Sequence, residues 1–182
     1  LHLARSGAMA YTFLKSRSAP VGRSLVEDDK LDAARHVSDR AAARKVELRL
    51  PSDHVVTTKV EPQAPYEILP IPDAAIGDRI GVDIGPLTVR DYAKLLWSAK
   101  TVVWNGPMGV FEIPPFDAGT SAIARAVAEV NGTTIVGGGD SVAAVAKAGV
   151  SDRITHISTG GGASLELLGG RRLPGVEALA DR

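Results

Sequence analysis

Two runs of three glycines, each set between a strand pattern and a helix pattern, most constrain how this chain can fold. The first run, Gly137–Gly139, follows the β-branched residues 133–136, and the second, Gly160–Gly162, follows residues 154–158. Apolar residues then recur at helical spacing after each run. Strand, glycine loop and helix in this order form crossover units, which give parallel strands covered by helices on both faces.

The same order of elements begins earlier in the chain. Residues 80–84 and 101–104 have the apolar pattern of strands, and a Gly-Pro or Asn-Gly-Pro sequence ends each of them. Apolar side chains at helical spacing follow, over residues 89–96 and 123–130. The second half of the sequence therefore predicts an α/β fold of the Rossmann-like class, a doubly wound, mostly parallel sheet with helices on both faces.

The first half of the sequence is less regular. It predicts a short helix over residues 8–14 and a longer one over about residues 25–44, where Ser24 and the residues after it fit a capping box. Alternating apolar residues predict a strand over residues 46–50. Residues 51–72 hold five of the eleven prolines, so this segment is predicted to be mostly loop, with an edge strand at most.

Length and composition favour one domain and exclude several kinds of function. A chain of 182 residues is predicted to form a single domain over residues 1–182. Lysine plus arginine and aspartate plus glutamate both number 21, so no basic excess is present to bind nucleic acid or an anionic membrane. The absence of cysteine excludes disulfides and thiolate chemistry, and no apolar run approaches the roughly 20 residues that a membrane span requires.

Both glycine loops are predicted to lie where a phosphorylated ligand would bind. In a doubly wound sheet, ligands bind beyond the carboxyl ends of the strands, and both loops are expected there, each directly before a helix. A helix N-terminus offers unpaired amides and a partial positive charge, and glycine lets an anion approach the backbone. A single loop of this kind is as often only a tight turn, but two of them favour a ligand with several phosphates.

Neither loop matches a standard nucleotide-binding motif. No Gly-Lys-Ser/Thr sequence follows at the spacing of a Walker A loop. Val142 and Leu165 stand where a dinucleotide motif has its third glycine, so a dinucleotide site is disfavoured.

Two carboxylates near these loops have alternative roles. Asp140, in the first turn of its helix, can be an N-cap or a ligand of Mg²⁺ beside nucleotide phosphates, and its position alone favours the cap. Glu112, in a loop with two glycines and a proline, can be a solvated surface residue or can accept hydrogen bonds from ribose hydroxyls. The residues themselves leave both alternatives open.

Longer motifs at these positions resemble the C-terminal, nucleotide-binding half of the phosphoglycerate kinase family. The resemblance spans nearly the whole chain and is most specific at residues 101–112, 136–141 and 156–168. It implies an ATP- or ADP-binding domain of an enzyme that transfers a phosphoryl group between ATP and 3-phosphoglycerate in glycolysis. It also implies a Mg-ATP or Mg-ADP cofactor and a cytoplasmic location.

The resemblance implies roles for individual residues on the base side of the site. Adenine would lie near Gly81 and Val82, with Pro107 and Val110 on its other side. Glu112 would hold the ribose hydroxyls. The same resemblance thus favours the functional alternative for this carboxylate.

On the phosphate side, the resemblance implies contacts with the first glycine loop and the residues after it. These are Gly137, Gly138, Gly139, Asp140 and Ser141. Asp140 would also face the magnesium ion. Amides of the second loop would stabilise the phosphoryl group in transfer, because phosphoryl transfer needs mostly positioning and charge stabilisation. They belong to Thr159 and to the three implied catalytic residues, Gly160, Gly161 and Gly162.

The chain also departs from the family. The family's chain is about twice as long, and its N-terminal half, with the basic cluster that holds 3-phosphoglycerate, is not in this sequence. The first strand–helix unit of the nucleotide half and its lysine-bearing loop are also missing, so the predicted sheet is incomplete at its N-terminal end. Arg5-Ser6-Gly7-Ala8 replaces a triple glycine next to the adenine and is expected to weaken binding.

These departures set the expectations for the isolated chain. We expect weak nucleotide binding, no transfer to 3-phosphoglycerate without the N-terminal domain, and self-association through an uncovered strand edge and apolar faces. The alternatives are a non-catalytic nucleotide-binding remnant and a truncated gene product. Neither nucleic acid nor a membrane is an expected partner.

Overall fold

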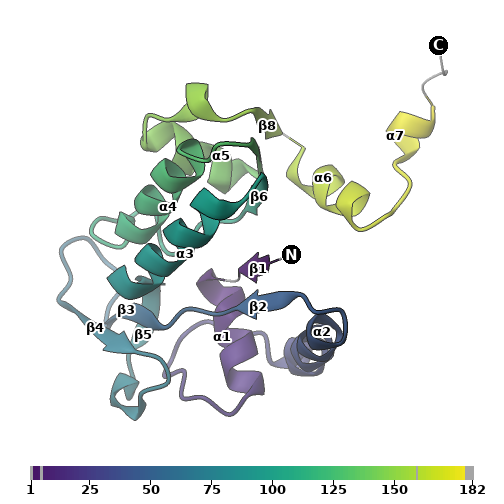
Figure 1. Cartoon of the computed structure of the whole chain (residues 1–182). Coiled ribbons are helices and arrows are strands. Elements are labelled where there is room, and N and C mark those ends of the chain that lie inside the picture. The colour runs from purple at the N-terminus through teal and green to yellow at the C-terminus, as the bar shows by residue number, and fades with distance from the viewer. Residues whose placement is uncertain (1, 5, 159, 179–182) are drawn as a thin grey trace.

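The computed structural model describes residues 2–4, 6–158 and 160–178, and Figure 1 shows the path of the chain. The strands are β1 (His2–Ala4), β2 (Glu47–Arg49), β3 (Asp53–Thr57), β4 (Tyr66–Pro70), β5 (Ile80–Ile84), β6 (Thr101–Asn105), β7 (Thr133–Gly137) and β8 (His156–Ser158). The helices are α1 (Gly7–Ser16), α2 (Leu31–Ala43), α3 (Pro86–Ser98), α4 (Ala118–Ala128), α5 (Gly139–Lys147), α6 (Gly161–Leu168) and α7 (Pro174–Glu177). Within the described residues, none of these helices is both long and apolar enough to cross a membrane.

The parallel sheet predicted for the second half of the chain is present. β6, β7 and β8 lie in that order and pair in parallel, with Trp104 opposite Val136 and Val136 opposite Ile157. Helix α4 packs against both α3 and α5, and the three helices lie beside this sheet (Figure 1). The α/β, Rossmann-like class predicted from the order of strand, glycine loop and helix is therefore confirmed.

A second sheet is antiparallel, which the order of elements did not predict. β3 is its central strand and pairs antiparallel with both β4 and β5. Residues 80–84, expected to open the parallel series, therefore lie in a separate sheet. The proline-rich segment contains β4 as the expected edge strand and, in addition, the fully buried β3. Pro65 directly precedes β4 and Pro70 is its last residue, and an edge strand tolerates the missing N–H.

Helix α2 begins later than its capping-box pattern predicts. It starts at Leu31, directly after a 3-10 turn over Asp28–Lys30. The Ser24 hydroxyl instead accepts a hydrogen bond from the Gly81 N–H at 2.9 Å. The capping-box prediction is wrong, because a tertiary contact with β5 engages the side chain that local spacing assigned to the helix.

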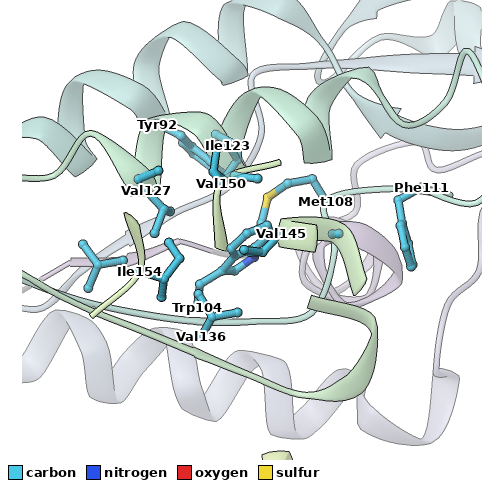
Figure 2. Packing of buried hydrophobic residues seen from close by; sticks show 14 of the residues in the cluster. Tyr92, Trp104, Met108, Phe111, Ile123, Val127, Val136, Val145, Val150 and Ile154 are labelled. Carbon is cyan, nitrogen blue, oxygen red and sulfur yellow. The ribbon is translucent and has the colours of Figure 1, made fainter. Parts of the chain in front are cut away.

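The largest hydrophobic cluster lies between α3, α4, α5 and the parallel sheet. Trp104 and Val136 of the sheet are almost fully buried, and Val127 of α4 packs in the same cluster (Figure 2). Burying a large apolar side chain contributes roughly 1.5–3 kcal/mol. Met108 and Phe111 also belong to this cluster, so the loop that follows β6 is anchored in the core.

The opposite face of the parallel sheet is less covered. Along β6, Trp104 is buried, whereas Val103, which points to the other face, is 45% exposed. Leu165 and Leu167 of α6 are also exposed, by 50% and 60%. This apolar surface agrees with the expectation of self-association, which stays a prediction; light scattering that finds a stable monomer would contradict it.

Candidate functional site

A cavity of about 870 Å³ lies between α1, β5 and the loop that follows β6. Its volume is in the usual range for small-molecule sites. The residues predicted to surround a base and a ribose all line it, namely Gly81, Val82, Pro107, Val110 and Glu112. The structure thus brings together two segments that are separated in the sequence by α3 and β6.

Helix α1 supplies a wall of this cavity: the resemblance placed its first residues, Gly7 and Ala8, beside the base but did not indicate Tyr11. Tyr11 is buried, and a Cβ placed on Gly81 would come within 1.6 Å of the Tyr11 hydroxyl oxygen. Position 81 therefore requires glycine while Tyr11 keeps its place. Met9 and Leu25, exposed by 45% and 69%, add apolar groups to the lining. Their apolar character was visible in the sequence, but only the fold connects them with β5.

The loop after β6 is held against β5 and α4. Thr120 Oγ1 accepts hydrogen bonds from the N–H groups of Met108 and Gly109, at 3.0 and 3.3 Å. The Val110 N–H donates to the Val82 carbonyl at 2.8 Å. Gly109 lies so close to β5 that a Cβ there would be 2.3 Å from the Val82 carbonyl oxygen. The loop and β5 therefore form one continuous wall.

The segment expected to weaken binding touches the same loop. Ser6 lines the cavity, and its hydroxyl donates to Met108 Sδ at 3.0 Å. The Gly7 N–H donates to the Met108 carbonyl at 3.1 Å. Arg5 lies outside the described residues. Of the two side chains that replace glycines here, the structure therefore places Ser6 at the cavity.

The first glycine loop forms the N-terminus of α5. Gly138 is the N-cap residue, with a φ of 90° that favours glycine, and the helix begins at Gly139. The backbone amides of the first turn have no partner within the helix, so they can bind an anion at its positive end. Asn105 connects this loop with the cavity: it lines the cavity, and its Nδ2 is 3.2 Å from the position of a Cβ on Gly138. Gly137, the last residue of β7, pairs with Asn105 in the sheet.

The side chains of Asp140 and Ser141 lie in different environments. Asp140 is exposed in the first turn of α5, whose N-cap is Gly138 and which has no side-chain cap. The N-cap alternative for Asp140 is therefore wrong, because Gly138 occupies the N-cap position and Asp140 is already the second residue of the helix. Ser141 is buried, and its Oγ accepts a hydrogen bond from the Gly106 N–H at 2.6 Å. Its side chain therefore holds the loop after β6.

The second glycine loop precedes α6. Thr159 lies outside the described residues, and Gly160 is the exposed N-cap residue of α6. The helix begins at Gly161, and a Cβ on Gly162 would meet open space. Leu165 of this helix lines the cavity, so α6 borders the site. The catalytic role of the three glycines stays a prediction.

Two buried titratable side chains also line the cavity. Asp83 is 4% exposed, and burial raises its pKa to about 7, although the N–H groups of Gly119 and Ile84 donate to its carboxylate at 2.6 and 2.9 Å. His54 is 3% exposed, and burial lowers its pKa to about 4. Its Nδ1 lies 2.9 Å from the Tyr11 hydroxyl, whereas its Nε2 has no hydrogen-bond partner among the described residues. Burial thus favours the neutral form of both side chains.

Comparisons with known proteins agree with this fold. The sequence profile named phosphoglycerate kinase matches residues 2–171. The phosphoglycerate kinases of Solibacter usitatus and Pseudothermotoga lettingae are 56% and 50% identical over 173 and 176 residues. These alignments cover 95% and 97% of this chain. The chain belongs to the phosphoglycerate kinase family, a family of kinases.

Solved structures give the same result. The phosphoglycerate kinase of Coxiella burnetii matches with a TM-score of 0.92 at 43% identity, and that of Pyrococcus horikoshii with a TM-score of 0.82 at 30% identity. Both alignments cover 97% of this chain but only 45% and 44% of those proteins. The chain likewise spans 43% of the Solibacter usitatus protein, so it corresponds to less than half the length of its relatives.

Proposed function

We propose that residues 1–182 form the C-terminal, nucleotide-binding domain of a phosphoglycerate kinase, which binds Mg-ATP or Mg-ADP for phosphoryl transfer in cytoplasmic glycolysis. The observation that carries this proposal is the junction at Asn105, which lines the cavity and lies against Gly138 at the N-terminus of α5. A largely apolar cavity beside a helix N-terminus suits a nucleotide, because the base is flat and apolar and the phosphates are anions.

In this proposal the base lies in the cavity, against the wall that β5 and the loop after β6 form together. Gly81 and Val82 contact the adenine from β5, and Pro107 and Val110 contact it from the loop. Glu112 is exposed where it lines the cavity, so its carboxylate can accept hydrogen bonds from ribose hydroxyls without a large cost of burying charge.

The phosphates are proposed to lie at the N-terminus of α5. Amides of the loop Gly137–Gly139 and of Asp140 and Ser141 donate to phosphate oxygens there. The Asp140 carboxylate would hold the magnesium ion there. The described residues hold no cluster of three histidine, aspartate or glutamate side chains that could bind a metal ion. Phosphate oxygens of the nucleotide and water would supply the remaining ligands, as is common for magnesium.

Transfer itself is proposed to need groups from outside this chain. Amides of Gly160, Gly161 and Gly162 can stabilise the transferred group, but the described lining of the cavity contains no lysine or arginine. Phosphoryl transfer relies on positioning and on cations that neutralise the developing charge. We therefore propose that 3-phosphoglycerate binds only when the rest of the family's chain is present.

A non-catalytic nucleotide-binding remnant is the second candidate function. The same lack of cationic side chains in the described lining favours it. The two candidates share nucleotide binding and differ in whether transfer can be restored.

The chain is expected to bind Mg-ADP and Mg-ATP with a Kd on the order of 0.1–1 mM. The glycine loop at α5 and the carboxylate of Glu112 provide attraction, whereas Ser6 narrows the cavity beside Met108. Isothermal titration calorimetry measures this binding directly. A folded chain that gives no heat with millimolar nucleotide would exclude the proposed function.

The role of Asp140 is tested in the same titration. Asp140→Asn should weaken Mg-ADP binding about tenfold and change metal-free ADP binding by less than about twofold. The exposed Asp152, in the turn after α5, is a matched control, and Asp152→Asn should change neither. Equal losses with and without magnesium would instead indicate that Asp140 contacts a phosphate.

No transfer to 3-phosphoglycerate is expected from the chain alone in a coupled assay. Losing the positioning of one reactant forfeits roughly 7–11 kcal/mol of barrier lowering. Addition of the part of the Solibacter usitatus enzyme that this chain does not match should restore measurable turnover. Robust turnover without it would contradict the proposal, and nucleotide binding without turnover in its presence would favour the remnant.

A further inference from the structure

Helix α5 holds the loop after β6 at two separate points. Near its start, Ser141 Oγ accepts a hydrogen bond from the Gly106 N–H at 2.6 Å. At its last residue, Lys147 Nζ donates to the Phe111 carbonyl at 2.7 Å and pairs with Asp117 Oδ2 at 2.9 Å. A helix of nine residues is about 13 Å long and stiff, so the two contacts fix the loop relative to the glycine loop at the helix N-terminus.

The segment that Lys147 contacts includes Glu112. Lys147 joins the two ends of residues 111–117, because Phe111 and Asp117 bind the same ammonium group. The Phe111 side chain is 7% exposed and belongs to the core, while the next residue, Glu112, is exposed and lines the cavity. Lys147 therefore binds the carbonyl group of the peptide bond that directly precedes Glu112.

We propose that Lys147 is a positioning residue that keeps the Glu112 carboxylate directed at the cavity, where it accepts hydrogen bonds from the hydroxyl groups of a bound nucleoside. This inference rests on the proposed nucleotide binding. Removing the ammonium group frees the Phe111 carbonyl and separates it from Asp117, so the Glu112 carboxylate no longer has one direction. If Lys147 formed only a surface ion pair, its replacement would not change the affinity for one ligand more than the affinity for another.

The test compares two ligands that differ only at the ribose. Mg-ADP and an ADP analogue that lacks both ribose hydroxyls are titrated into the whole chain and into Lys147→Met, Lys147→Arg and Glu112→Gln. Lys147→Met should weaken ADP binding about tenfold and change the Kd of the analogue by less than about twofold, because only ADP has the hydroxyl groups that bind Glu112. Lys147→Arg, which keeps the charge and the donors, should recover most of the loss. Lys94→Met, at an exposed position of α3, is the matched control and should change neither ligand.

A double variant decides whether Lys147 acts through Glu112. In the Glu112→Gln background, Lys147→Met should cause no further loss of ADP affinity. Additive losses, or an equal loss for both ligands in the single variant, would overturn the inference.

A second measurement does not require binding. The Ile113 N–H donates to the Val110 carbonyl within this loop, at 3.3 Å. Hydrogen exchange at Ile113 should be at least about tenfold faster in Lys147→Met than in the wild type, and unchanged in Lys94→Met. If the wild type binds no nucleotide, the proposed function fails, and unchanged exchange at Ile113 would separately refute the positioning role.

Discussion

Replacing Asp53 by alanine is expected to lower the free energy of unfolding by about 3–5 kcal/mol. Asp53 is 1% exposed at the start of β3. Its carboxylate accepts hydrogen bonds from the N–H groups of Leu87 and Thr88, at 2.9 and 2.7 Å, and from the Thr88 hydroxyl at 2.6 Å. The substitution removes one acceptor group and leaves three donors without this partner.

The size of this effect follows from what the carboxylate does for α3. The helix begins at Pro86, so Leu87 and Thr88 carry two of the N–H groups that have no partner within the helix. Gly85, the N-cap residue, makes no side-chain cap, and Asp53 takes that role from β3, the neighbour of the strand that precedes the helix. Hydrogen bonds to a charged acceptor are stronger than neutral ones, and buried donors without a partner each cost roughly 1–3 kcal/mol.

Urea denaturation of Asp53→Ala and Asp73→Ala compares the buried cap at Asp53 with a helix cap at the surface. Asp73 accepts a hydrogen bond from the Ala75 N–H at 2.8 Å and caps a short 3-10 helix. Asp73→Ala should therefore cost only about 1 kcal/mol. Equal losses of unfolding free energy for the two variants would show that the contact of Asp53 with α3 stabilises the fold no more than a surface cap does.

The second large effect is a change in the pH dependence of stability when either Asp83 or His54 is replaced. Burial raises the pKa of Asp83 from 3.8 to about 7, so between these values the folded state binds more protons than the unfolded state. This carboxyl group then stabilises the fold fully below pH 3.8 and loses that contribution as the pH rises through about 7.

His54 has the opposite effect in an overlapping pH range. Burial lowers its pKa from 6.5 to about 4, with Arg79 also lowering it and Asp53 and Asp73 opposing the shift. Between these values the unfolded state binds more protons, so stability is lost as the pH falls from 6.5 through about 4. From about pH 4 to 6.5 the two contributions therefore oppose each other, each with a slope of up to about 1.4 kcal/mol per pH unit.

Single substitutions should make each slope visible. As the pH rises from 4.5 to 6.5, the free energy of unfolding of Asp83→Asn should increase by roughly 2–3 kcal/mol relative to that of the wild type. Over the same rise, the free energy of unfolding of His54→Asn should decrease by a similar amount relative to the wild type. Asparagine at position 54 does not titrate and retains a polar atom near that of Nδ1, which faces Tyr11. Chemical denaturation at several pH values measures the slopes, and profiles parallel to that of the wild type would refute the opposing titrations.

Part of the fold and of the site was predictable because it depends on local signals. The strand pattern at residues 101–104 and the glycine run after residue 136 identify β6, β7 and the start of α5, and the structure confirms these elements. Motif resemblance, rather than periodicity, selected Gly81 and favoured the binding role of Glu112, and both residues line one cavity. Their roles toward a nucleotide stay predictions.

The α/β class, the strands β6, β7 and β8 and the positions of the glycine loops follow from local sequence patterns, because periodicity and glycine act over a few neighbouring residues. The antiparallel pairing of β5 with β3 depends on the whole fold, since a strand has the same period of two in either direction. The same holds for the binding of Ser24 to Gly81, the cap that Asp53 provides for α3 and the contact of Lys147 with the loop beside Glu112. Each of these contacts joins residues far apart in the chain, so no local pattern could indicate them.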